Sequence, residues 1–233
     1  MKNYIKEASK GIICILIYLF SSKFELGLLE LLNIDYNNMP LSIKVTYLII
    51  WEIIIVSCIA LVLNKKIEKD IKDMKKNHKI YFKKYFKFWL IAVGIMMMSN
   101  AIIGILNNGS VAGNEEALRD MFKISPIYIF FSSVIYAPLC EELIFRQSFR
   151  NLIPNKFFFI IVSGFVFGAL HVVGSYSSPV DLLYLIPYCA PGLAFAYILA
   201  DSDNIFISTG LHFMHNGILI ALQFLFLILG VNV

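Results

Sequence analysis

The stretch Tyr136–Arg150, YAPLCEELIFRQSFR, places two glutamates and an arginine inside a long apolar segment of the chain. Of the 233 residues, 59% are hydrophobic and only 15% are charged, whereas a soluble domain carries about 25% charged residues. Apolar runs long enough to cross a bilayer, about 17–25 residues, recur along the chain. The alternating pattern of an outer-membrane barrel is not visible. The composition therefore predicts an all-α, polytopic bundle of transmembrane helices.

We expect about seven membrane spans in one transmembrane domain, 1–233. The first apolar run follows Lys2, Lys6 and Lys10, as in a signal peptide, but it has no A-x-A cleavage site. We therefore interpret it as the first transmembrane helix. The expected spans lie near 11–32, 41–63, 88–106, 124–150, 157–174, 180–200 and 205–229.

The segment 64–87 carries the strongest topological signal, because its ten lysines face only three acidic residues. We interpret it as a loop, and the positive-inside rule places it in the cytoplasm. Attraction to anionic lipid headgroups accounts for such a loop, and no nucleic-acid partner is expected. Threading outward from it puts the N-terminus inside and the segment 107–123, with Glu115, Glu116 and Asp120, outside. The turns at 147–156 and Asp201–Asn204 then lie inside.

Ionisable side chains within membrane segments are costly and mark functional sites or paired structural contacts. A rise of about 1.5 Å per residue places Glu141, His171, His212 and Asn216 within the inner half to the middle of the hydrocarbon layer. Three separate helices therefore carry polar groups at similar depth. The ionisable candidates are Glu52, Glu141, Glu142, Arg146, His171, His212 and His215.

Residue spacing separates the two adjacent glutamates. Glu142 and Arg146 are four residues apart, so they lie on one helix face and can form an ion pair. Glu141 is rotated by about 100° from Glu142 and remains available for another role. His212 and Asn216 are also four residues apart and present one polar face.

Helix breakers and small residues suggest a cavity near these side chains. Pro138 is expected to kink its helix, and Pro187 and Pro191 are expected to kink the sixth. Gly164 and Gly168 form a small-xxx-small face that allows close helix approach. Irregular backbone at membrane depth requires partners from protein or a wet cavity.

Three motifs in this region resemble those of the CPBP family of CAAX-prenyl-protease and bacteriocin-processing membrane proteins, also called Abi. Glu141-Glu142-Leu-Ile-Phe-Arg146 is similar to its E-E-x-x-x-R motif, and Phe167-Gly-Ala-Leu-His171 to its F-x-x-x-H motif. His212-Phe-Met-His-Asn216 is similar to its H-x-x-x-N motif. Their order matches that of the family, so the resemblance implies a CPBP-like catalytic core in 124–229. The segment 1–123 would hold N-terminal membrane helices and the basic loop.

The resemblance implies an intramembrane endopeptidase and a role for each motif residue. Glu141 would be the general base that activates water, with help from His171, while His212 and Asn216 would stabilise the oxyanion. Glu142 and Arg146 would support the site structurally. Peptide hydrolysis does require an activated water and hydrogen-bond donors for the oxyanion. His215 and Glu52 receive no role from the motifs, and Glu52 is interpreted as a contact with a neighbouring helix.

Three alternatives stay open at the level of sequence. Glu141, His171 and His212 could instead bind zinc, although H-E-x-x-H spacing is absent and a metal-free glutamate mechanism is favoured. The chain could be a catalytically silent membrane partner or a bacteriocin-immunity protein of the same fold, or a transporter with a polar site at mid-membrane. For a peptidase, the substrate is expected to be a membrane-associated protein or peptide. The residue usage favours a bacterial plasma membrane.

Overall fold

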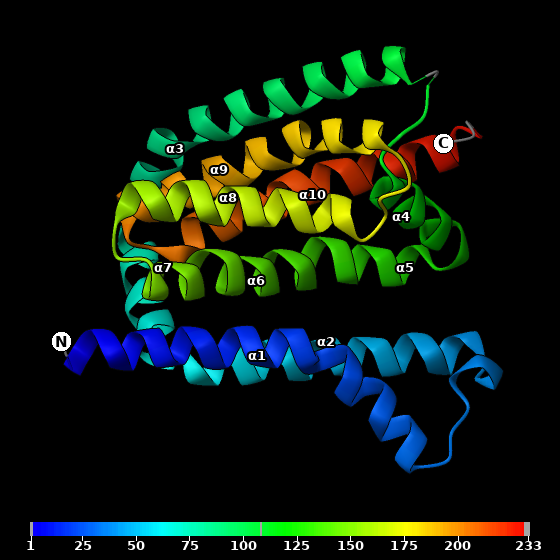
Figure 1. Cartoon of the computed structure of the whole chain (residues 1–233), viewed down its shortest axis with the longest axis horizontal. Coiled ribbons are helices and arrows are strands. Elements are labelled where there is room, and N and C mark those ends of the chain that lie inside the picture. The colour runs from blue at the N-terminus through cyan, green and yellow to red at the C-terminus, as the bar shows by residue number, and fades with distance from the viewer. Residues whose placement is uncertain (1, 108, 231–233) are drawn as a thin grey trace.

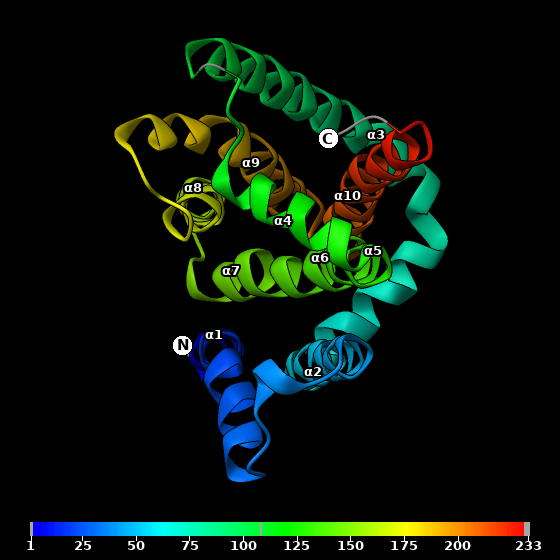
Figure 2. The same cartoon turned by 90° about the vertical axis from the view of Figure 1, so that its right-hand side faces the viewer.

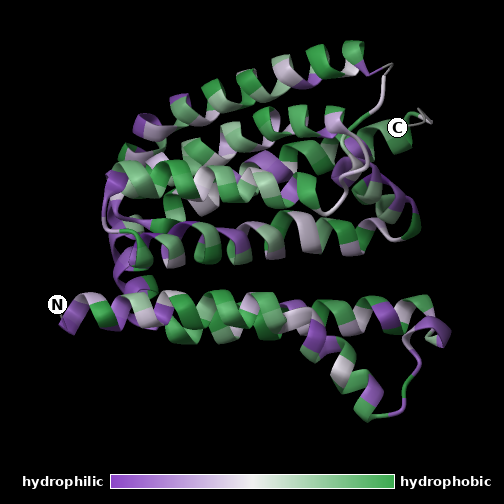
Figure 3. Cartoon of the chain, in the orientation of Figure 1, coloured by the Kyte–Doolittle hydropathy of each residue, from purple (hydrophilic) through white to green (hydrophobic). Residues whose placement is uncertain are grey.

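The computed structural model describes residues 2–107 and 109–230, and within these ranges the chain consists of helices and turns without a strand. Seven of the described helices are long and apolar enough to cross a membrane, which confirms the predicted all-α polytopic architecture. Hydrophobic residues cover the flanks of these helices (Figure 3). The seven are α1 (Lys2–Leu31), α2 (Leu41–Val62), α3 (Asn64–Leu106), the composite helix Pro126–Leu152, α8 (Lys156–Val173), the span Pro179–Ser202 and α10 (Ile205–Ile228). The sixth span comprises the 3-10 turn η4 (Pro179–Tyr184) and α9 (Leu185–Ser202).

The helices form a bundle with a separate hairpin beneath it. The composite helix, α8, α9 and α10 surround the centre, and α3 runs along the outside of α9 and α10 (Figures 1 and 2). The hairpin of α1 and α2 packs below the composite helix, and a 3-10 turn, η1 (Tyr36–Asn38), lies in its connection. A short helix, α4 (Gly113–Ile124), lies across one end of the bundle (Figure 2). This arrangement leaves a space between the central helices that α4 covers.

The composite helix alternates between α and π geometry. It runs through α5 (Pro126–Ile129), the π segment η2 (Phe130–Tyr136), α6 (Ala137–Glu141), the π segment η3 (Glu142–Ser148) and α7 (Phe149–Leu152). The chain accommodates Pro138 between two π segments and continues as a helix. The predicted inner turn is shorter than expected, since the helix continues to Leu152.

The lysine-rich segment is helical, so its interpretation as a loop is wrong. Residues 64–87 form the first half of the 43-residue helix α3. The physical reason is that lysine and acidic side chains of this segment have partners at the turn between α9 and α10. Lys69 Nζ lies 2.9 Å from Asp203 Oδ2, and Lys84 Nζ lies 2.7 Å from Asp201 Oδ2. Buried Asp70 accepts the backbone N–H of Ile205, the first residue of α10, at 3.0 Å.

Glycines bring α8 and α9 into close contact, as the small-residue spacing predicts. A Cβ atom on Gly164 would lie 2.9 Å from Leu193 Cα, and one on Gly168 would lie 2.9 Å from the backbone N of Cys189. Pro187 falls in the first turn of α9, where its missing N–H has little consequence, so it is not the expected kink. Pro191 does lie inside the helix.

Candidate active site

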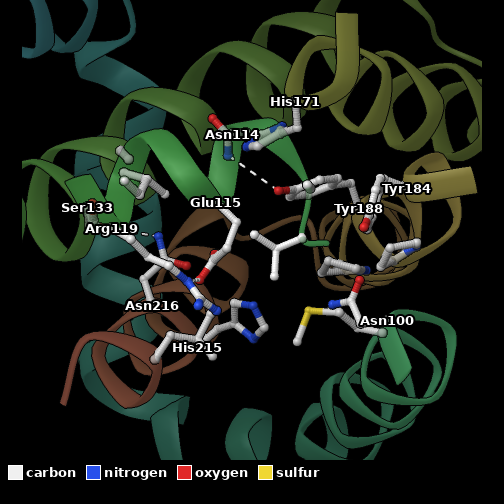
Figure 4. Close-up of a pocket in the computed structure, with 18 of the residues that line it drawn as sticks. Asn100, Asn114, Glu115, Arg119, Ser133, His171, Tyr184, Tyr188, His215 and Asn216 are labelled. Carbon is white, nitrogen blue, oxygen red and sulfur yellow. Dashed lines mark hydrogen bonds and ion pairs between the residues drawn. The ribbon is translucent and has the colours of Figure 1, made fainter. Parts of the chain in front are cut away.

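A cavity of about 490 Å³ occupies the space between the central helices and α4. Such a volume falls within the range of ligand pockets, about 300–1,000 Å³. Glu141, His171, His212 and Asn216, from three helices, all line it. Asn114, Glu115 and Arg119 line it from α4 (Figure 4). The four residues that the sequence singled out for catalysis therefore share one cavity.

Glu142 and Arg146 lie beneath this cavity and are fully buried. Arg146 Nε lies 3.5 Å from Glu142 Oε1, in the i,i+4 arrangement that the sequence predicts. The Arg146 guanidinium carbon lies 4.4 Å from the centre of the Phe167 ring, an attractive cation–π arrangement. Among the described residues, the guanidinium nitrogens of Arg146 have no hydrogen-bond partner. Glu142 and Phe167 are thus the groups that compensate this buried cation.

His212 connects the two glutamates. Its Nδ1 lies 3.1 Å from Glu142 Oε1, and its Nε2 lies 3.7 Å from Glu141 Oε2. Its ring is stacked on Phe195, with 4.9 Å between ring centres. The side chain of Glu141 is 19% exposed, toward the cavity, whereas that of Glu142 is completely buried. The adjacent glutamates therefore have different surroundings.

His171 is held by its own helix and by α9. Its Nδ1 lies 2.8 Å from the carbonyl oxygen of Phe167, so Nδ1 carries the proton and donates. The ring is stacked on Tyr188, with 4.9 Å between ring centres. In the neutral ring, Nε2 is then the acceptor. The residue lies in the last turn of α8, close to the end that α4 covers.

Asn216 is positioned by the π geometry around Pro138. In a π helix the carbonyl of residue i accepts from residue i+5, and the N–H of Ala137 does donate to the carbonyl of Ser132. The corresponding donor for Ser133 would be Pro138, which has no N–H. Asn216 Nδ2 donates to this carbonyl instead, at 2.7 Å. A proline on one helix thereby fixes a polar side chain on another.

The structure also places the two polar residues without an expected role. Glu52 does contact a neighbouring helix: its Oε1 accepts from Ser132 Oγ at 2.7 Å and from Tyr128 Oη at 3.1 Å. His215 is buried, lines the cavity and meets Trp89 edge to face, with 6.5 Å between ring centres.

Sequence reasoning missed the contribution of α4 to the cavity. Its signal was the amphipathic segment after Gly113, in which Asn114, Glu115, Leu118 and Arg119 recur with helical spacing.

The side chains of Glu141, His171 and His212 are the candidate ligands for zinc. In the part of the chain that the structure describes, no three His, Cys, Asp or Glu side chains are grouped so that they could hold a metal ion. Both ring nitrogens of His212 face glutamates, and His171 Nδ1 is occupied by a carbonyl. The arrangement of Glu141, His171 and His212 therefore does not fit a three-ligand zinc site.

Comparison with known proteins places these features in a family. Residues 123–218 match the family described as type II CAAX prenyl endopeptidase Rce1-like. The chain is 30% identical over 144 residues to YdiL of Bacillus subtilis, which is named provisionally as a membrane peptidase; the match covers 58% of this chain and 55% of YdiL. It is 25% identical over 231 residues to the membrane-embedded CAAX protease MroQ of Staphylococcus aureus, covering 92% of this chain and 89% of MroQ.

The match therefore spans about half the length of YdiL. A match to a protein of Mycoplasma capricolum spans 44% of the length of that protein. No solved structure matches the chain. In its ordered motifs and in these matches, the chain is similar to the CAAX-type intramembrane proteases. These matches support the assignment of the segment 123–218 to the CPBP family, as the three motifs predicted.

Proposed function

We propose that the protein is an intramembrane endopeptidase in which Glu141 activates water. The observation that carries the proposal is the convergence of Glu141, His171, His212 and Asn216 on one cavity. Type II CAAX endopeptidases give the family its description, and MroQ is named a protease. Both support the same reaction class.

The reaction begins with a proton transfer to Glu141. A water in the cavity gives a proton to this carboxylate while its oxygen forms a bond to the carbonyl carbon of the substrate. His171 Nε2 accepts a hydrogen bond from the same water and orients it. The C–N bond then breaks as Glu141 returns the proton to the amine that leaves. One peptide bond and one water are consumed, and one carboxylic acid and one amine are formed.

The oxyanion would be stabilised by His212 and Asn216. Asn216 uses one of its two amide hydrogens for the Ser133 carbonyl and keeps the other for the cavity. The Nδ1–H of His212 donates to Glu142, so a second proton is needed before Nε2 can donate to an oxyanion. In that state, two carboxylates, Arg146 and the imidazolium form a cluster without net charge.

The substrate is proposed to be a membrane-associated protein or peptide, and the setting a bacterial plasma membrane with the basic half of α3 in the cytoplasm. A catalytically silent partner or a bacteriocin-immunity protein of the same fold is the competing function. Retention of every polar group that the reaction requires favours the enzyme, because a silent relative has no need for Glu141 to face a cavity.

Cleavage by the purified protein, assayed together with its metal content, tests the proposal. Membrane peptides compared by mass spectrometry between cells with the wild type and with Glu141→Gln supply the substrate. The glutamate mechanism predicts wild-type cleavage in metal-free protein. Loss of cleavage on removal of zinc, and its return with stoichiometric zinc, would instead make Glu141 a partner of metal-bound water.

A further inference from the structure

The described residues that line the cavity lie between the middle of the bundle and the end that α4 covers, which is called the open end below. Its shallow part is lined by residues from the end that α4 covers: Gly104 late in α3, Tyr184 before α9 and Gln223 late in α10. Its deep part ends at Glu141 and His212, about halfway along their helices. Below them, Glu142, Arg146, Ile144 and Ser163 are buried and close the space. Within the described residues, no lining group comes from the opposite end.

The two ends of the bundle differ strongly in charge. The closed end holds the first half of α3, with ten lysines and three acidic residues over 64–87. The open end holds the segment 107–125, in which Glu115, Glu116 and Asp120 outnumber Arg119 and Lys123. The positive-inside rule places the closed, basic end in the cytoplasm and the open end outside.

We infer that the scissile peptide reaches Glu141 from the extracytoplasmic side, beneath α4. This inference rests on the proposed peptidase function and names its substrate class. The peptide bond must be exposed at the outer face, in an exported peptide or in the outer juxtamembrane segment of a membrane protein. A protein confined to the cytosol cannot reach the cavity, because the buried layer around Arg146 lies between.

One face of α4 is then in contact with the substrate. Asn114, Glu115 and Arg119 point into the cavity in Figure 4, where Arg119 Nε is paired with Glu115 Oε1 at 3.0 Å. Asn114 Nδ2 lies 3.5 Å from Tyr188 Oη across the opening. Glu116, on another face of the same helix, does not line this cavity. The helix therefore offers both a test position and a matched control.

Cysteines introduced one at a time and labelled with a membrane-impermeant, bulky maleimide test the side of access, and the labelling of the parent chain, which has four cysteines of its own, is subtracted as background. In intact cells, Asn114→Cys and Glu116→Cys should react, and Lys75→Cys should react only after permeabilisation. Cleavage by labelled Asn114→Cys should fall by about tenfold or more, because the adduct prevents substrate positioning. Labelled Glu116→Cys should keep its rate within about twofold, as expected when transition-state contacts are unchanged.

The outcomes separate this inference from the function on which it rests. Labelling of Lys75→Cys in intact cells, or protection of Asn114→Cys there, would show access from the cytoplasm and overturn the inference. Equal inhibition at both α4 positions would remove the assigned substrate face. Correct labelling with no cleavage by any form would overturn the peptidase and its substrate class, while the side of access would stand.

Glu52 carries a second, independent inference about the same reaction. It belongs to α2, outside the segment 123–218 that matches the family, and its carboxylate is buried at membrane depth. Its Oε1 accepts hydrogen bonds from Ser132 and Tyr128 on the composite helix, whereas Oε2 has no partner among the described residues. A carboxylate buried within the membrane is energetically costly, so the presence of one at Glu52 suggests a role beyond packing.

Ser132 connects Glu52 to the catalytic cavity. Its carbonyl accepts the N–H of Ala137 in the π segment, and the next carbonyl, that of Ser133, holds Asn216. Both serines line the cavity. We propose that Glu52 is a positioning residue, which holds the π register and thereby sets Asn216 and Glu141 relative to each other. This role, too, presupposes the peptidase.

The test compares two substitutions of Glu52 that differ in one property. Glu52→Gln keeps an oxygen that can accept both hydrogen bonds, whereas Glu52→Leu removes it. Misplaced catalytic groups lower kcat rather than raise KM, so Glu52→Leu should lower kcat by about tenfold or more. Glu52→Gln should stay close to wild type. Tyr47→Phe is the control, because it removes a 2.7 Å hydrogen bond from α2 to the Glu25 carbonyl without touching the composite helix.

Amide hydrogen exchange over 130–140 gives a reading that does not depend on cleavage. It should accelerate in Glu52→Leu and remain unchanged in Glu52→Gln and Tyr47→Phe. If Glu52→Leu does not fold, Ser132→Ala removes the nearer donor and should show the same changes more weakly. Unchanged kcat and exchange in a folded Glu52→Leu, or a loss in Glu52→Gln as large as in Glu52→Leu, would contradict the positioning role.

Discussion

Glu141 and Glu142 are neighbours in sequence, yet the bundle gives them opposite surroundings. Glu142 lies between Arg146 and His212 without access to the cavity, and Glu141 faces the cavity with His212 Nε2 at 3.7 Å. A carboxylate that must take and return a proton needs access to water, which only Glu141 has. Two substitutions that remove the same charge should therefore fail in different ways.

Glu141→Gln should abolish cleavage and leave the fold intact. The amide has nearly the same shape but cannot accept a proton from water, so the loss should be about 10²-fold or more, the scale of general-base catalysis. Cleavage rate and thermal unfolding in detergent, measured on the same preparation, check this. Substantial cleavage by Glu141→Gln at wild-type stability would require another base.

Glu142→Gln should act through stability instead. It leaves the Arg146 cation in a buried site without its carboxylate, and breaking a buried ion pair costs about 3–5 kcal/mol. The unfolding temperature and the membrane yield should fall well below those of Glu141→Gln. Equal losses of yield and of activity for the two variants would argue against separate roles for the two glutamates.

Residue spacing predicted part of this chemistry and missed the rest for a physical reason. The Glu142–Arg146 pair follows from helical geometry within one element, and the structure contains it. The contact of His212 with both glutamates depends on how two helices pack. The bond from Asn216 to Ser133 depends on a backbone register that no side-chain pattern specifies.

At the scale of elements, the composite helix shows how a proline can build a site. Pro138 leaves the Ser133 carbonyl of the first π segment without its regular backbone donor, and the side chain of Asn216 bonds to this carbonyl. Such interruptions are found frequently at functional sites. Here the interruption lies just before Glu141.

Pro138→Ala should weaken catalysis without unfolding the protein. The new N–H at 138 can donate to the Ser133 carbonyl and thereby competes with Asn216 for it. Released from its anchor, Asn216 should stabilise the oxyanion less well, and kcat should fall by about tenfold or more. Steady-state kinetics measure this, and Pro126→Ala, at the start of α5, is a control away from the cavity. An unchanged kcat in Pro138→Ala would mean that the proline does not set Asn216.

The α8–α9 contact should be intolerant of a single methyl group. In Gly164→Ala the added Cβ would lie 2.9 Å from Leu193 Cα, so the two helices would have to separate. Overpacking of this kind costs about 1–3 kcal/mol. Gly94→Ala is the matched control, since no described atom lies within 4 Å of its added Cβ. Thermal unfolding should separate the two variants, and equal stability would show that α8 can shift freely.

The number of spans was predictable because hydropathy directly reports the solvent of each segment. Whether 64–87 is a loop or a helix was not, because lysine density determines the side of the membrane rather than the local conformation. The helical conformation of this segment is stabilised by partners distant in sequence, such as Asp203 for Lys69 and Ile205 for Asp70. Likewise, the position of α4 over the cavity depends on the packing of the whole bundle.

At the scale of the whole molecule, α3 connects parts that are distant in sequence. Its basic half passes from the hairpin of α1 and α2 to the turn between α9 and α10, and its apolar half runs along the bundle (Figure 1). Since α10 carries His212 and Asn216, the contacts of α3 with this turn hold the base of a catalytic helix. The N-terminal half of the chain is thus part of the support of the site.

Asp203→Asn tests this connection and has a defined pH dependence. Burial raises the pKa of the Asp203 carboxyl, but Lys69 and Lys66 outweigh burial, and the net pKa lies below its ordinary value. A carboxyl with a lowered pKa contributes stability above its unfolded pKa of about 3.9. That contribution is lost as pH falls through the lower folded value. Since the side chain is 69% exposed, we expect at most about 1 kcal/mol.

Asparagine also tolerates the left-handed backbone at this position, where φ is 51°, so the substitution isolates the charge. Wild type should therefore unfold at a higher temperature than Asp203→Asn at pH 5–8, and the difference should shrink below about pH 4. Added salt should reduce it as well, because exposed pairs are screened. Asp120→Asn, which removes an exposed pair with Lys123 within α4, is the control for loss of a surface charge. If the two proteins unfold at the same temperature at neutral pH, or if the difference in unfolding temperature grows as the solution is acidified, the lysines of α3 do not stabilise the turn through Asp203.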